Sequence, residues 1–207
     1  MSGNLIITIG RENGSGGLEV GQKLAQRLGI KCYDKEILSE ASKNSGFAEQ
    51  IFHEYDETSQ KNMLFAWTAS SGTFGYGMPL ATQVYLEQFK AIREIASRGP
   101  CVFVGRCSDY VLKDLGYELV NVFVHASLET RIKAVCEREH VDEIKARAMI
   151  IKTDKDRASY YNYYTDQKWG RIENYHIVID SSLIGINDVV ELITAYIDIR
   201  KKNKQVE

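Results

Sequence analysis

The stretch that decides the fold runs from residue 4 to residue 17 and reads NLIITIGRENGSGG. Its first part, residues 4–9, is a short β-branched run closed by Gly10, and such a run bounded by turn residues predicts a strand buried on both faces. Residues 18–28 then carry apolar side chains at helical spacing up to Gly29, a typical C-terminal stop. The sequence therefore predicts a strand, a glycine-rich loop and a helix, in that order.

The glycine loop has the composition of a phosphate cradle. Gly14, Gly16 and Gly17 lack the Cβ that would block positive φ values, so successive amides can converge on an anion where the helix dipole favours negative charge. The strict P-loop pattern G-x-x-x-x-G-K-[ST] fails, because Arg11, Gly17 and Leu18 replace its first glycine, its lysine and its hydroxyl residue. We expect a phosphate cradle whose missing positive charge comes from Arg11 or from a lid residue. The alternative is a tight turn between strand and helix.

The rest of the chain alternates short apolar strands with helices. Further strands are predicted at residues 30–33, 101–104, 120–124 and 177–179. Helices are predicted after Asp34 as N-cap, over 80–98, after Ser127 as N-cap to 139, from 141 to about 160, and over 187–201. This order predicts an α/β fold with a five-stranded parallel sheet and helices on both faces. No linker divides the chain, so residues 1–207 are predicted to form a single domain.

Composition limits the partners. The 207 residues carry 26 Lys and Arg against 28 Asp and Glu, for a formal charge of -2, so any polyanion site must be local. No apolar run approaches the roughly 20 residues that span a bilayer, and no signal-peptide pattern opens the chain. The four cysteines lie singly, without metal-ligand spacing. We expect a cytoplasmic protein with reduced thiols, no metal site, and no nucleic-acid or membrane partner; the sequence does not indicate an oligomeric state.

Several further segments carry a family resemblance. Beside the glycine loop these are YDKEIL at 33–38, VGRC at 104–107, VHASLETR at 124–131, DKDRASYY at 154–161 and IDSSL at 179–183. With them, the chain resembles the cytidylate kinase-like family over nearly its whole length. The resemblance implies a P-loop nucleoside monophosphate kinase fold with lid and monophosphate-binding insertions, ATP with Mg²⁺ as donor, and nucleotide substrates. It also implies an acceptor-binding region at about 46–98 and a lid-like region at about 140–175.

The same resemblance implies roles for particular residues. The donor phosphates would be held by Asn13, Gly14, Ser15, Gly16, Gly17 and Leu18. Arg106 matches an arginine that grips the acceptor phosphate, while Asp154 and Arg157 match lid-side residues that contact the acceptor nucleotide. Asp34 aligns with an acidic residue that opens the monophosphate-binding region. The chain departs from the family pattern at Gly17 and Leu18, at Val104 in place of an aspartate, and at Ile150 in place of a lid arginine.

Three arginines, Arg106, Arg157 and Arg11, are thus the candidate catalytic residues. Arg131 joins Asp34, Arg106, Asp154 and Arg157 as a candidate substrate contact; for Arg131 a solvated, ion-paired helix face is the alternative. The basic segment at 152–157 fits a mobile lid that closes over polyphosphate, or else a solvent-facing helix. The tyrosines between 160 and 164 are expected to pack against the core, with base stacking as the alternative.

Three functions remain open on this evidence. The first is ATP-dependent phosphoryl transfer to a nucleoside monophosphate, with CMP or dCMP as the first acceptor to test. The second, motivated by Gly17 and Leu18, is a nucleotide- or phosphate-binding protein that has lost catalysis. The third is a small-molecule kinase with a different acceptor, in which residues 65–76 shape a pocket unlike one for cytosine.

Overall fold

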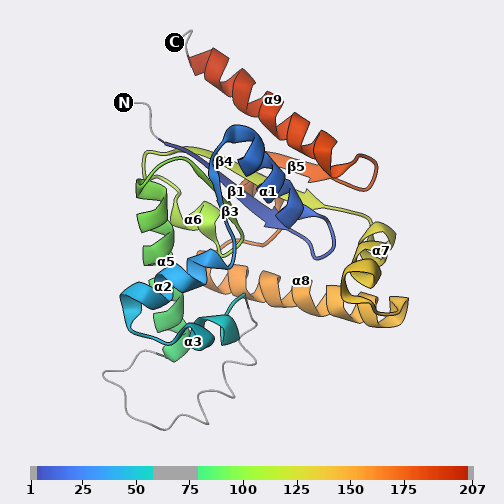
Figure 1. The fold of residues 1–207 in the computed structure, drawn as a ribbon, viewed down its shortest axis with the longest axis horizontal. Coiled ribbons are helices and arrows are strands. Elements are labelled where there is room, and N and C mark those ends of the chain that lie inside the picture. Colours follow the sequence, from blue (N-terminus) through green and yellow to red (C-terminus); the bar gives the residue numbers. More distant parts are fainter. Residues whose placement is uncertain (1–3, 58–78, 205–207) are drawn as a thin grey trace.

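The computed structural model describes residues 4–57 and 79–204, and Figure 1 shows their arrangement. Five strands form one sheet in the order β2-β3-β1-β4-β5, and every pairing is parallel. The strands are β1 (Leu5–Arg11), β2 (Lys31–Tyr33), β3 (Cys101–Val104), β4 (Glu118–His125) and β5 (Ile177–Asp180). The predicted α/β fold with a five-stranded parallel sheet is confirmed.

Helices follow the strands as the hydrophobic periodicity predicts. They are α1 (Gly17–Leu28), α2 (Glu36–Ser45), α3 (Glu49–Glu54), α5 (Leu80–Ser97), α6 (Ser108–Val111), α7 (Leu128–Glu139), α8 (Glu143–Thr165) and α9 (Ile186–Lys204), with a 3₁₀ turn at Ile172–Asn174. No helix in the described ranges is long and apolar enough to cross a bilayer. The pocket expected at residues 65–76 lies outside the described residues.

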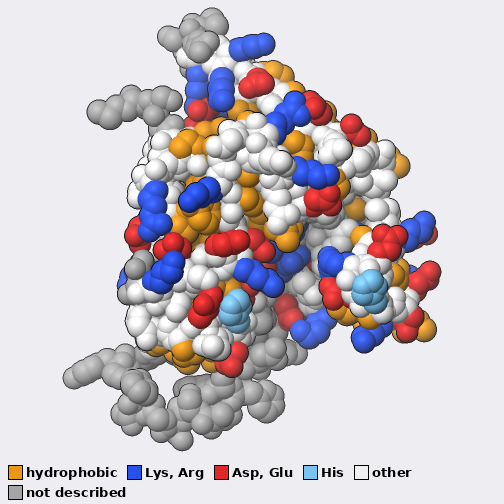
Figure 2. All heavy atoms as spheres, viewed as in Figure 1, with side chains coloured by type: hydrophobic (Ala, Val, Ile, Leu, Met, Phe, Trp, Pro, Cys, Tyr) orange, Lys and Arg blue, Asp and Glu red, His pale blue; other side chains and the backbone are white. Residues whose placement is uncertain are grey.

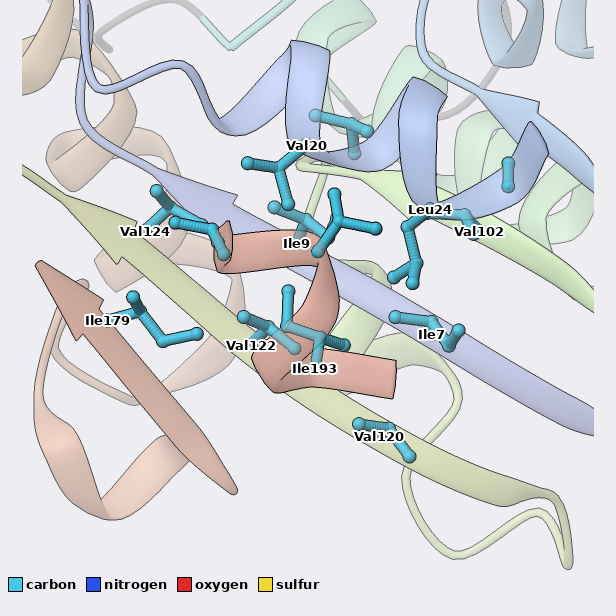
Figure 3. Close-up of a cluster of buried hydrophobic side chains, with 14 of the residues drawn as sticks. Ile7, Ile9, Val20, Leu24, Val102, Val120, Val122, Val124, Ile179 and Ile193 are labelled. Carbon is cyan, nitrogen blue, oxygen red and sulfur yellow. The ribbon is translucent and has the colours of Figure 1, made fainter. Parts of the chain in front are cut away.

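The sheet is buried on both faces. On one face, Ile7 and Ile9 of β1 pack in a cluster with Val20 of α1 and Ile193 of α9, as Figure 3 shows. On the other face, Ile6 joins a second cluster contributed largely by α2, α3 and α5. Alternate residues of β1 therefore enter different cores, which explains its almost uninterrupted apolar sequence.

Two predicted helix starts have different outcomes. Ser127 caps α7, because its hydroxyl accepts a hydrogen bond from the Thr130 amide. The prediction that Asp34 caps the next helix is wrong: Lys35 is the N-cap residue of α2 and makes no side-chain cap bond. The Asp34 carboxylate instead pairs with the buried guanidinium of Arg106. A charge-assisted bond to a buried cation outweighs a surface cap.

The charged helix predicted from 141 begins later and runs further. His140 adopts a left-handed conformation (φ 54°) and ends α7, and Asp142 then caps α8 by accepting from the Lys145 amide. α7 and α8 form a hairpin that packs through Ile132 and Ile150, beside the main body of the sheet (Figure 1). Ile150, which stands where a lid arginine was expected, is therefore a buried hairpin residue.

Candidate functional site

The glycine loop leaves β1 at the carboxyl edge of the sheet and enters α1. Gly14 and Gly16 have φ values of 84° and 79°, as the cradle interpretation requires. Within the described part of the chain, the amides of Gly14, Gly16, Gly17 and Leu18 donate to no acceptor. These amides lie at the N-terminus of a 12-residue helix, so the loop fits an anion such as phosphate.

Gly17 is glycine for a different reason from the one predicted. It is the first residue of α1 and does not adopt a positive φ. A Cβ built at this position would lie only 2.4 Å from the Cβ of Arg11. Arg11 stands where the P-loop pattern has its first glycine, so its side chain fills the space that a lysine at position 17 would need. The two departures from the P-loop pattern are therefore sterically linked.

Three arginines from separate elements converge beside the loop. Arg11 ends β1, Arg106 follows β3, and Arg157 lies on α8. The Glu57 carboxylate joins them: it accepts two hydrogen bonds of 2.8 Å from Arg11 and one of 3.3 Å from Arg157 Nε, and Arg106 donates its backbone amide at 3.0 Å. Glu57 therefore organises three residues that were predicted as catalytic.

The side chain of Arg106 is only 2% exposed. Its guanidinium binds Asp56 at 3.0 and 2.8 Å, the Val104 carbonyl oxygen at 2.9 Å, and Asp34. These bonds use four of its five N–H groups. Burial alone would lower the pKa of Arg106, but Asp56, Glu57 and Asp34 raise it above its ordinary value. A phosphate that bound the Arg106 guanidinium through more than its one remaining N–H group would have to displace Asp34, Asp56 or the Val104 carbonyl.

Arg11 and Arg157 share one carboxylate. Burial and the neighbouring Arg11 lower the pKa of Arg157 to about 10, although Glu57 and Asp154 act to raise it. Burial would raise the pKa of Glu57, but Arg11, Arg157 and Arg106 together hold it well below its usual range. The pKa of the adjacent Asp56 is raised by burial, even with Arg106 beside it.

Glu57 should make the free energy of unfolding depend on pH in the acid range. Its folded pKa lies below the unfolded value of about 4.3, so its charge stabilises the fold above that pH, and the contribution is lost as the pH falls. We expect the free energy of unfolding to fall more steeply between about pH 5 and pH 3 in the wild type than in Glu57→Gln. Urea titrations across this range measure the difference. Glu54→Gln, at an exposed position, should keep the wild-type slope; a Glu57→Gln profile parallel to the wild type would contradict the prediction.

Asp154 and Arg131 lie against the glycine loop rather than beside Arg106. An oxygen of Asp154 accepts from the backbone amide of Asn13 at 2.7 Å, and its second oxygen pairs with Arg131. Arg131 is ion-paired, as the alternative interpretation expected, but it is only 9% exposed, so its helix face is not solvated there. Its Nε lies 3.4 Å from a Glu12 oxygen but makes no hydrogen bond among the described residues. A phosphate that used the Asn13 amide would replace the Asp154 carboxylate.

A cleft of about 480 Å³ joins the glycine loop to the three converging arginines. It runs from Gly14 and Gly16, past Arg157, to Asp34 and Arg106. On the face shown in Figure 2, acidic and basic side chains mix around the hollow beside the α7–α8 hairpin. Among the predicted site residues, Ser15, Arg131 and Asp154 are outside the cleft lining. The cleft thus brings the predicted donor and acceptor sides into one space.

The tyrosines after the basic segment at 152–157 pack in the core, as expected. Tyr160 and Tyr161 are buried, and Tyr164 stacks on Tyr85 of α5 with ring centroids 3.6 Å apart. Tyr163 is exposed. The packing interpretation is therefore confirmed for three of the four tyrosines.

Sequence reasoning missed Asp56 and Glu57. They follow the short helix α3 in the segment EYDE at 54–57, which carries no periodic or motif signal. Only their contacts with Arg106 and Arg11 reveal their importance. Lys35, at the start of α2, also lines the cleft and was overlooked as a site residue.

The parallel sheet, the glycine loop before α1 and the cleft at the carboxyl edge are those of a P-loop kinase fold. The model of the cytidylate kinase-like family matches residues 6–183, so the chain belongs to that family. A protein from Methanopyrus kandleri named cytidylate kinase is 23% identical over 203 residues, covering 94% of both chains.

Solved structures agree with this fold. An uncharacterized protein from Eubacterium ventriosum is 32% identical, with a TM-score of 0.72, and the match covers 94% of this chain and 98% of that one. A gluconokinase from Sinorhizobium meliloti has a TM-score of 0.56 at 16% identity, covering 100% of this chain and 98% of the other. At that identity the likeness shows the fold alone.

Proposed function

We propose that this protein is an ATP-dependent kinase that transfers the terminal phosphoryl group of ATP to a small acceptor. A nucleoside monophosphate of the CMP or dCMP type is the first acceptor to test. The observation that carries the proposal is the set of glycine-loop amides that have no acceptor among the described residues; they open on the same cleft as Arg11, Arg106 and Arg157. Membership of the cytidylate kinase-like family supports it.

The described residues fit the phosphates of the donor better than its metal. The loop amides offer hydrogen bonds and a helix N-terminus to an anion. Leu18 has no hydroxyl to offer Mg²⁺, and within residues 4–57 and 79–204 no three metal-ligating side chains gather. Mg²⁺ that accompanies ATP usually keeps several waters and binds phosphate oxygens, with one or two carboxylates from the protein. Glu12, in the cleft wall, is a carboxylate that could serve as such a ligand. The metal would supply charge neutralisation during transfer.

A kinase for a hydroxyl-bearing acceptor is the second candidate. The acceptor side presents Asp34, Asp56 and Glu57, and Arg106 is already engaged by carboxylates. A doubly charged acceptor phosphate would meet these acids, whereas hydroxyl groups can donate hydrogen bonds to them. In such a transfer the hydroxyl oxygen forms the new bond to phosphorus, the bond to ADP breaks, and the hydroxyl proton passes to a carboxylate.

Phosphorus NMR of the purified protein with ATP, Mg²⁺ and an acceptor panel tests the proposal. The panel contains CMP, dCMP, the other nucleoside monophosphates and neutral polyols. A new diphosphate signal from one nucleotide would support the first candidate, and a new phosphomonoester the second. Broadened ATP signals without product would point to a binding protein that has lost catalysis. Unperturbed ATP signals would contradict the proposal.

Gly14→Val provides the matched control for a contaminating kinase. A Cβ at Gly14 would lie 2.7 Å from the Arg131 carbonyl oxygen, and the φ of 84° disfavours a β-branched residue. This variant should lose any genuine transfer, while activity from a contaminant would persist.

A further inference from the structure

The cleft is electrically balanced in a way that leaves little free positive charge for a polyphosphate. Five basic side chains line it, namely Arg11, Lys35, Arg106, Arg138 and Arg157, and the same number of carboxylates line it too. Phosphoryl transfer needs positive groups that face the phosphates rather than internal carboxylates. The question is which of the five cations is free to do so.

Four of these five basic side chains already bind other side chains of the protein. Arg11 and Arg157 bind Glu57, and Arg106 binds Asp34 and Asp56. The Nε of Arg138 lies 2.8 Å from Glu139, and its Nη2 donates to the Asn13 side chain at 3.1 Å. The Lys35 ammonium, by contrast, has no ion pair or hydrogen bond with any described residue.

Lys35 is exposed, and its place in the secondary structure does not favour a lysine. It is the N-cap residue of α2, where Ser, Thr, Asp or Asn would stabilise the helix and where the helix dipole disfavours a cation. Its neighbour Asp34 is fixed by Arg106, which anchors the backbone at the cleft wall. Lys35 also follows β2, which lies next to β3, the strand that leads to Arg106.

We propose that Lys35 supplies the free positive charge that contacts phosphate groups in the cleft, in place of the lysine that the loop lacks at position 17. The inference rests on the proposed function, because it assigns a residue to that site. Position 17 itself is closed to a lysine by the Arg11 side chain. A flexible ammonium elsewhere in the cleft lining can supply the same positive charge, because its long side chain lets the charge move.

Calorimetric titration of Lys35→Met with Mg²⁺–ATP, inorganic tripolyphosphate and adenosine tests the assignment. Loss of one charge-assisted contact should weaken ATP and tripolyphosphate binding by about ten- to a hundredfold. Any binding of adenosine should be unchanged. Lys35→Arg should keep most of the affinity. Lys31→Met, on the preceding strand β2 and outside the cleft lining, should behave as the wild type.

The outcomes separate the inference from the proposed function. ATP and tripolyphosphate affinities of Lys35→Met within about twofold of the wild type would overturn the Lys35 assignment, as would an equal loss in Lys31→Met. A large loss in Arg138→Met with none in Lys35→Met would move the role to Arg138. A wild type that binds tripolyphosphate through Lys35 but transfers no phosphoryl group would refute the kinase proposal alone. A wild type that binds neither phosphate compound would overturn both.

Discussion

Replacing Glu57 with alanine should lower the free energy of unfolding by about 3 kcal/mol or more, the cost of breaking a buried ion pair by removing one partner. The Glu57 side chain is only 13% exposed. Its loss would leave Arg11 and Arg157 without their shared counter-charge and the Arg106 amide without its acceptor. Urea unfolding followed by circular dichroism measures the change.

Two further variants serve as comparisons for Glu57→Ala. Glu54→Ala, at an exposed position three residues away, should change stability by no more than about 0.5 kcal/mol. Glu57→Gln should fall between Glu57→Ala and the wild type, because its amide oxygen can still accept from Arg106. If Glu57→Ala cost less than about 1 kcal/mol, Glu57 would not hold the arginine cluster together.

Restoring a lysine at Gly17 should abolish nucleotide binding rather than improve it. The new Cβ would lie 2.4 Å from the Arg11 Cβ and 3.1 Å from its Cγ. The Cβ of each residue is fixed to its own backbone, so α1 or the end of β1 would have to move. Overpacking of this kind costs about 1–3 kcal/mol. The amides of Gly16 and Leu18 would then no longer converge. Titration with Mg²⁺–ATP measures the loss.

Gly17→Ala separates the steric effect from the charge. It adds the Cβ without the ammonium group, so it should lose binding to a similar extent. Leu18→Ser is the matched control, because it restores the P-loop residue type at the neighbouring position without adding an atom beside Arg11. Leu18 is 39% exposed, so a smaller polar side chain fits there and the variant should fold as the wild type does. Tighter ATP binding by Gly17→Lys would show that Arg11 moves aside easily.

The layout of the fold was predictable from the sequence because its signals are local. β1, the glycine loop and α1 are contiguous, and their alternation of β-branched residues, glycines and helical spacing follows from backbone geometry. The same holds for Ser127, whose cap needs only the amide three residues later. The family resemblance likewise depends on contiguous segments between residues 6 and 183, which can be compared with the family pattern without knowledge of the fold.

The chemistry of the cleft depended on tertiary structure. Glu57 meets Arg11 across 46 positions of sequence and Arg157 across 100, and Asp154 reaches the Asn13 amide across 141. Such ion pairs leave no periodic trace, and each residue taken alone resembles a surface charge. The sequence by itself determined a five-stranded P-loop kinase fold with a glycine cradle. Only the packing of distant segments decided which arginines are neutralised and why position 17 must be glycine. It also decided that Lys35 lines the cleft without an ion pair among the described residues. Burial and Coulomb interactions act through space, so the order of residues along the chain does not reveal them.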